Sequence, residues 1–127
     1  MSKITTHQDL DVYRRSFDVS MQIFTLSKTF PKEELYSLTD QIRRSSRSVS
    51  ANIAEGWRKR RYVKSFVSKL SDAEAEAAET QVWLEYAVSC EYLSADQARS
   101  LYQVYNDILR TIVGIINHKD KWVLPGD

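Results

Sequence analysis

The apolar residues in the last third of the chain recur in alternating steps of three and four, a spacing that restricts the fold more than any other feature. The series is Ala98, Leu101, Tyr105, Ile108, Ile112 and Ile115. This is the seam spacing of helices that pack against one another in coiled coils and helical bundles. The 127 residues include three glycines and two prolines, so few positions would interrupt a helix. The sequence therefore predicts an all-α protein of one domain, residues 1–127.

Four long helices are predicted, over residues 8–30, 32–57, 62–91 and 94–119. Pro31 separates the first two, because the residue before a proline avoids helical geometry. Gly56 is a common type of helix end, and Ser94 to Gln97 form a capping box that starts the fourth helix. Short connections make neighbouring helices antiparallel, so we expect an up-down-up-down four-helix bundle. Residues 1–7 are expected to be a short flexible N-terminus and residues 120–127 a C-terminal tail.

The first predicted helix carries two apolar stripes, although a surface helix needs one. One stripe consists of Leu10, Tyr13, Phe17, Met21 and Phe24, and the other includes Val12, Val19, Ile23 and Leu26. At about 100° per residue, the two stripes lie roughly 150° apart around the helix. We therefore expect a homo-oligomer in which Val12, Val19, Ile23 and Leu26 form the subunit interface. The alternative is a helix at the centre of its own bundle.

Charge is unevenly distributed along the chain, and its distribution is more informative than its total. Arg43 to Lys64 include eight basic residues and one acid, whereas Ser71 to Glu91 include six acids and no base. The basic candidates for nucleic-acid binding are Arg43, Arg44, Arg47, Arg58, Lys59, Arg60, Arg61 and Lys64. The planar fork of arginine suits phosphate oxygens, and the flanking Trp57 and Tyr62 could stack on unpaired bases. The sequence thus favours binding of RNA, more than DNA, with low sequence specificity.

Three alternatives to this interpretation remain open at the level of sequence. The acids Asp72, Glu74, Glu76 and Glu79 could pair with the arginines and use up their charge. Trp57 could equally pack against the end of the bundle. A ring-forming scaffold for protein partners, with no nucleic-acid role, is the competing function.

The run Asn52 to Gly56 contains a second polar signature, Asn52, Glu55 and Gly56. Polar groups beside a packed helix interface must find partners, so a structural role is expected for Asn52 and Glu55. A catalytic carboxylate would need a second acid or base and a pocket, and the sequence offers no evident partner. We expect no enzymatic activity.

No cofactor or metal is expected either. His7 and His118 are far apart in sequence, and the repeated Glu-x-x-His pattern of di-metal bundles is absent. Cys90 is the single cysteine, so no intrachain disulfide forms. The serines Ser45, Ser46, Ser48 and Ser50 favour close helix packing over phosphorylation. The sequence contains neither an apolar run of about 20 residues nor a signal peptide pattern, so a cytoplasmic protein is expected.

Several motifs resemble those of the four-helix-bundle family of 23S rRNA-intervening-sequence proteins. They are Asp9-Leu10-x-Val12-Tyr13, Phe30-Pro31-Lys32-Glu33-Glu34-x-Tyr36-x-Leu38, Gln41-Ile42-Arg43-Arg44-Ser45, Ser48, Asn52-Ile53-Ala54-Glu55-Gly56 and Glu79-Thr80-Gln81. Their order and spacing match over most of the chain, and the fourth helix matches in pattern alone. The segment after Gly56 is richer in basic residues than the family pattern.

The resemblance implies properties that periodicity does not show. Some members of the family are encoded within insertions in large-subunit ribosomal RNA genes. The resemblance implies that members form ring-shaped homopentamers and that the family has no assigned enzymatic activity. A similar bundle is the accessory variability protein of diversity-generating retroelements, which binds nucleic acid and a reverse transcriptase. By resemblance we therefore expect a pentamer with a nucleic-acid or protein partner and no association with membranes.

Overall fold

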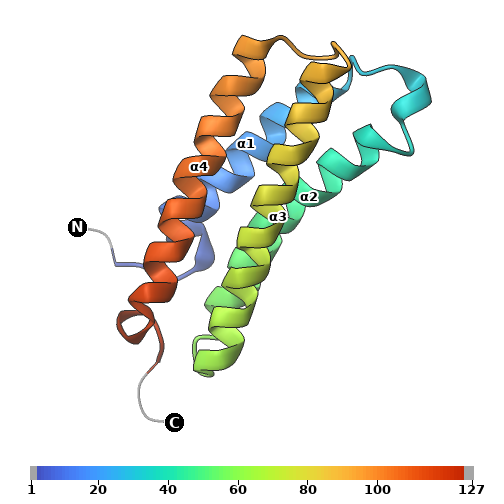
Figure 1. Cartoon of the computed structure of the whole chain (residues 1–127). Coiled ribbons are helices and arrows are strands. Elements are labelled where there is room, and N and C mark those ends of the chain that lie inside the picture. Colours follow the sequence, from blue (N-terminus) through green and yellow to red (C-terminus); the bar gives the residue numbers. More distant parts are fainter. Residues whose placement is uncertain (1–2, 125–127) are drawn as a thin grey trace.

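The computed structural model describes residues 3–124, which form four long helices and three short 3₁₀ helices and contain no strand. The long helices are α1 (Asp11–Ser27), α2 (Leu38–Arg58), α3 (Val63–Ser89) and α4 (Ala95–Asn117). The 3₁₀ helices are η1 (His7–Asp9), η2 (Lys32–Glu34) and η3 (Lys119–Lys121). Each long helix packs against the next along the chain, and α4 returns to α1 (Figure 1). The predicted all-α four-helix bundle is confirmed.

The core extends along the whole bundle and takes side chains from all four long helices. Ile42, Val49 and Ile53 of α2 are at most 1% exposed, as are Tyr105 and Ile108 of α4. Ser94 accepts a hydrogen bond from the backbone of Gln97 at the start of α4, so the predicted capping box is present. The seam that the sequence showed in the fourth helix therefore faces the interior.

The stripe of α1 that faces the core of the bundle is the one that we expected at a subunit interface. Val12, Val19 and Ile23 are at most 2% exposed within the single chain, and Leu26 is half-buried against the same core. Their assignment to a subunit interface is therefore wrong, because α1 needs this stripe to pack on both α2 and α4. Phe17 and Met21 of the other stripe are 47% and 48% exposed.

Small residues bring α2 and α3 together, and these two helices share the most extensive contact in the bundle. Ser45 and Ser46 of α2 are buried, and the Thr80 hydroxyl of α3 donates to Ser45 Oγ at 2.8 Å. Ala77 of α3 is fully buried. Because small side chains let two helix axes approach closely, the prediction of close packing at the serines is confirmed for Ser45 and Ser46.

The first two helices begin and end at other residues than predicted. The α1 helix ends at Ser27 rather than at residue 30, and Pro31 precedes the 3₁₀ helix η2 rather than α2. At the start of α2, the Glu34 carboxylate accepts hydrogen bonds from the Ser37 and Tyr92 hydroxyls, at 2.6 and 2.8 Å. These bonds lower the pKa of Glu34 and raise the pKa of Tyr92 to about 12. They tie the start of α2 to the connection between α3 and α4.

Gly56 does not end α2, which continues to Arg58. A Cβ atom built on Gly56 would meet Leu70 and Lys69 of α3 at 3.5 Å, an ordinary contact distance. The glycine lies at a close approach of two helices, and the helix stops two residues later, where the chain turns into α3.

The ends of the described chain are better ordered than predicted. After α4, the 3₁₀ helix η3 is followed by Trp122 and Val123, which pack half-buried against the core. The Leu124 N–H donates to the Arg60 carbonyl oxygen at 2.9 Å, so residues 120–124 are not a free tail.

At the N-terminal end, Thr5 and Thr6 donate to the Asp9 carboxylate and lower its pKa. The remaining parts of the two predicted termini, residues 1–2 and 125–127, lie outside the described residues.

Candidate nucleic-acid interface

Five of the eight predicted basic residues lie in the short connection from α2 to α3 or at the helix ends beside it. We call this set the turn cluster, and its members are Arg58, Lys59, Arg60, Arg61, Tyr62 and Lys64. Arg58, Lys59, Arg61 and Lys64 are exposed, and Tyr62 is 60% exposed. Within residues 3–124, Arg58, Lys59 and Lys64 form no ion pair. Their charge is therefore available to a ligand.

Trp57 differs from its predicted role as a stacking platform for bases, because it is 5% exposed. The Arg60 guanidinium lies 3.4 Å from the centroid of the Trp57 ring, and its Nε donates to the Trp57 carbonyl oxygen at 2.8 Å. Partial burial lowers the pKa of Arg60, and the nearby charge of Arg58 adds to the effect. The alternative role, packing at the end of the bundle, is the correct one for Trp57.

Arg44 is the arginine that the acidic helix neutralises. Its guanidinium forms ion pairs with Glu76 of α3, at 2.9 Å, and with Glu79. Glu79 also accepts a hydrogen bond from Trp83 Nε1 at 3.2 Å. Exposed pairs of this kind each contribute about 0–1 kcal/mol to stability. The pairing alternative is thus right for Arg44, which we leave out of the set of cations available to a ligand.

The other two arginines in the middle of α2 lie beside α1. The guanidinium groups of Arg43 and Arg47 lie 4.8 and 5.6 Å from the centroid of the Phe24 ring, and the Lys28 ammonium lies 4.8 Å from it. Arg43 Nε also donates to Ser27 Oγ at 2.8 Å. We call Lys28, Arg43 and Arg47 with this ring the Phe24 cluster. In the described part of the chain its three cations form no ion pair.

A cavity of about 560 Å³ adjoins the Phe24 cluster on the outer side of α2. We call it the α2 cavity, and it is lined by Leu35, Tyr36, Asp40, Arg43, Arg44, Arg47, Ser48 and Ala51. Tyr36 is 90% exposed and lies in the connection before α2. Lys28 was not predicted as a site residue, and Tyr36 was named in the sequence as part of a family motif alone. The spacing of Lys28 four residues after Phe24 was a usable signal, because such residues are neighbours on a helix.

Arg47 of the Phe24 cluster and Arg58 of the turn cluster lie along one side of α2. Arg47 and Arg58 are eleven residues apart, which is close to three full helical turns and roughly 16 Å along the axis. Ala51, which is exposed, lies between them. A single strand with 3.4 Å between stacked nucleotides would span that distance with about five nucleotides. The two clusters are thus positioned to contact one strand.

The polar signature has local structural partners. Asn52 Nδ2 donates to the Ser48 carbonyl oxygen at 2.9 Å, and Glu55 pairs with Lys69 of α3 at 2.8 Å. The bond to Glu55 raises the pKa of Lys69. We expected an arginine as the partner of Glu55, and the structure has a lysine. Both side chains make structural contacts of the kind that the sequence predicted.

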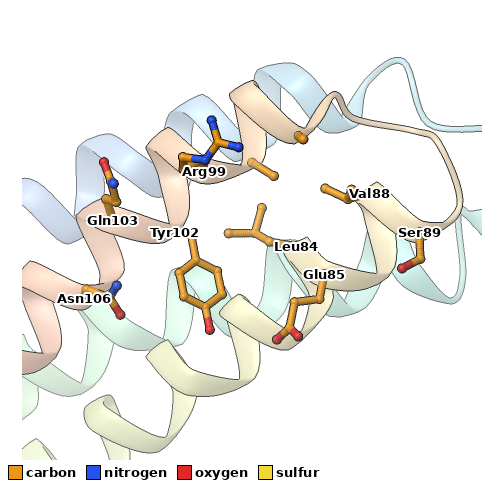
Figure 2. Close-up of a pocket in the computed structure, with 10 residues that line it drawn as sticks. Leu84, Glu85, Val88, Ser89, Arg99, Tyr102, Gln103 and Asn106 are labelled. Atoms are coloured by element: carbon orange, nitrogen blue, oxygen red, sulfur yellow. The ribbon is translucent and has the colours of Figure 1, made fainter.

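A second cavity, of about 600 Å³, lies between α3 and α4. Leu84, Val88 and Tyr102 give it an apolar wall, and the Tyr102 ring extends from α4 toward α3 (Figure 2). Its charged residues, Glu85 and Arg99, belong to opposite helices. In residues 3–124 no group of three histidine, cysteine or acidic side chains is arranged to hold a metal ion. In the same range no helix is both long and apolar enough to cross a membrane.

The fold and its surfaces define a helical-bundle protein with exposed basic residues along one helix and the turn that follows. Comparison with known proteins identifies the family within this class. The model of the 23S rRNA-intervening sequence protein family matches residues 8–114, and the chain belongs to this family.

A solved structure supports this membership. It is a protein of unknown function from the S23 ribosomal protein family of Bacteroides thetaiotaomicron, with 31% sequence identity and a TM-score of 0.76. The match covers 84% of this chain and 95% of that one. No curated protein matches the chain.

Proposed function

We propose that this protein is a cytoplasmic, non-enzymatic homo-oligomer that binds single-stranded RNA through the turn cluster and the Phe24 cluster. The observation that carries the proposal is that the acidic helix α3 pairs with Arg44 and leaves Arg47, Arg58 and Lys64 without an acidic partner in the described chain. Contacts from lysine and arginine to phosphates supply most of the affinity for nucleic acids that is independent of sequence.

Two further observations favour a single strand and RNA. Tyr36 and Tyr62 are 90% and 60% exposed beside the two clusters, and exposed aromatic rings stack on unpaired bases. The family takes its name from an intervening sequence of 23S rRNA. A scaffold for protein partners is the competing function, and the titration described next separates the two.

Reversing two charges of the turn cluster should weaken RNA binding. For the double variant Arg58→Glu and Lys59→Glu, we expect the affinity for a single-stranded 12-mer RNA to fall by at least about tenfold at low salt. The slope of log K against log salt should become shallower by about 1.4, because each lost phosphate contact on a single strand removes about 0.7. The anisotropy of a dye-labelled RNA, titrated at low and high salt, measures both quantities.

The matched control is the double variant Arg99→Glu and Arg110→Glu. It changes the net charge by the same amount, but on α4. These two arginines pair with Asp96 and Asp107 on their own helix, so binding should change little. Parallel titrations with duplex RNA and duplex DNA rank the ligands. If wild-type protein binds none of the three at low salt, the proposal is wrong and the scaffold function takes its place.

Self-association is the second part of the proposal, and the outer face of α1 supports it. Phe17 and Met21 are bulky apolar side chains that lie about half exposed on this face, and Tyr13 beside them is half-buried. Burying such side chains against a second copy would stabilise an oligomer by roughly 25 cal/mol per Å² of apolar surface removed from water.

A lysine on this face should dissociate the oligomer. We expect Met21→Lys to give a folded monomer, because the charge would have to be buried at the subunit contact. Gln22→Lys, at an exposed polar position one residue further on, should keep the oligomer. Light scattering with size-exclusion chromatography measures the mass of each. A monomeric wild type, or an unchanged oligomer for Met21→Lys, would contradict this role of α1.

A further inference from the structure

The Phe24 cluster and the α2 cavity form one composite site, because Arg43 and Arg47 belong to both. We propose that this site binds the end of an RNA strand that carries a terminal phosphate monoester, with the last nucleotide in the cavity. The inference rests on the RNA binding proposed above and specifies which part of the strand this site takes.

Positive charge is concentrated around the Phe24 ring. The cationic groups of Lys28, Arg43 and Arg47 all lie within 5.6 Å of the centroid of the Phe24 ring. The three positive charges are therefore close to one another. The negative face of the ring stabilises cations placed over it. A terminal phosphate carries about −1.5 to −2 charges at neutral pH, whereas each phosphate within a strand carries −1. Gathered positive charge therefore favours the terminal group.

A strand has a favourable path away from this site in one direction along α2. Asp40 lines the cavity near the start of α2, together with Leu35 and Tyr36. A carboxylate there would repel a further phosphate. In the other direction along α2, the surface continues past Ala51 to Arg58 and the turn cluster, and the carboxylate on this stretch, Glu55, is already paired with Lys69. We therefore place the strand end at the cavity and the body of the strand along α2.

The α2 cavity offers room and a stacking surface for a base. The cavity volume of about 560 Å³ lies in the range of sites that hold small ligands. The exposed Tyr36 ring offers a stacking face at its edge, and the Asp40 carboxylate can accept hydrogen bonds from a base or a ribose. Arg44 contributes to the wall, but Glu76 and Glu79 already bind its guanidinium.

The test compares three single-stranded RNA 8-mers of one sequence, with an internal dye, in titrations of the full-length protein. One carries a 5′-phosphate, one a 3′-phosphate and one hydroxyl groups at both ends. We expect one of the phosphorylated RNAs to bind at least about tenfold more tightly than the RNA with hydroxyl ends, and the preferred end gives the polarity of the strand. The advantage should disappear in Lys28→Gln and in Arg47→Gln, whose side chains are exposed.

Two further variants separate the end site from the rest of the interface. Arg58→Gln should lower the affinity for all three RNAs and leave the ratios of the affinities unchanged, because Arg58 would contact the body of the strand and not its end. Tyr36→Ala should weaken all three by about fivefold or more through lost stacking. Equal binding of the three RNAs to wild-type protein would overturn the end site and leave RNA binding standing. Absence of binding by all three would overturn the proposed function itself.

Discussion

Val19→Lys should prevent the chain from folding. The Val19 side chain is 0% exposed in the interior of the bundle, and a buried lysine without a partner must lose its hydration or its proton. We expect a loss of at least about 4 kcal/mol, a large part of the roughly 5–15 kcal/mol that stabilises a typical domain. Circular dichroism should show little helix at 25 °C, or a melting transition far below that of the wild type.

Met21→Lys is the matched control for folding, because it places the same side chain two residues further along α1. Met21 is 48% exposed, so in the single chain its lysine stays in water, and the monomer should remain helical with a cooperative melting transition. The prediction fails if Val19→Lys yields a well-folded helical protein. That result would mean that the stripe of Val12, Val19 and Ile23 faces outward.

Ala77→Leu should destabilise the bundle by about 1–3 kcal/mol, the usual cost of forcing extra methylene groups into a packed core. Ala77 is 0% exposed on α3, three residues before Thr80, whose hydroxyl contacts Ser45 of α2. The larger side chain must separate the two helices or adopt a strained rotamer. Urea denaturation followed by circular dichroism measures the change in the free energy of unfolding.

The neighbouring substitution Ala78→Leu tests whether position or size decides the effect. Ala78 is exposed on the same helix, and leucine is nearly as good a helix former as alanine. We expect a change of less than about 0.5 kcal/mol, as for most surface substitutions. Equal losses for the two variants would contradict the close approach of α2 and α3 at Ala77.

The helical architecture could be read from the sequence because apolar spacing and scarce glycine act locally. The same reasoning chose the wrong face of α1, since both stripes of that helix are rich in large apolar residues. The buried Ser16, Ser20 and Ser27 lie on the inner side with Val12 and Val19. Small residues of this kind mark a close helix contact, just as Ser45 and Ser46 do in α2. That signal was present in the sequence and would have identified the inner face.

The candidate site was predictable in part, because charge is visible in a sequence and pairing is not. The run from Arg43 to Lys64 identified the basic residues of α2 and the turn. It did not show which arginine meets Glu76 and Glu79, since these contacts bridge more than thirty positions along the chain. The Phe24 cluster was missed for the same reason, because α1 supplies the ring and α2 supplies two of the cations.

The stacking of Arg60 on Trp57 makes this end of the bundle suitable for optical detection without a dye. Indole emission depends on charges near the ring, and this guanidinium lies 3.4 Å from the ring centroid. Trp122 lines the same small cavity as Trp57, whereas Trp83 donates to Glu79 on α3. A ligand that draws Arg60 toward a phosphate would therefore alter the emission of Trp57, and this change would report the proposed binding at the turn cluster without a label.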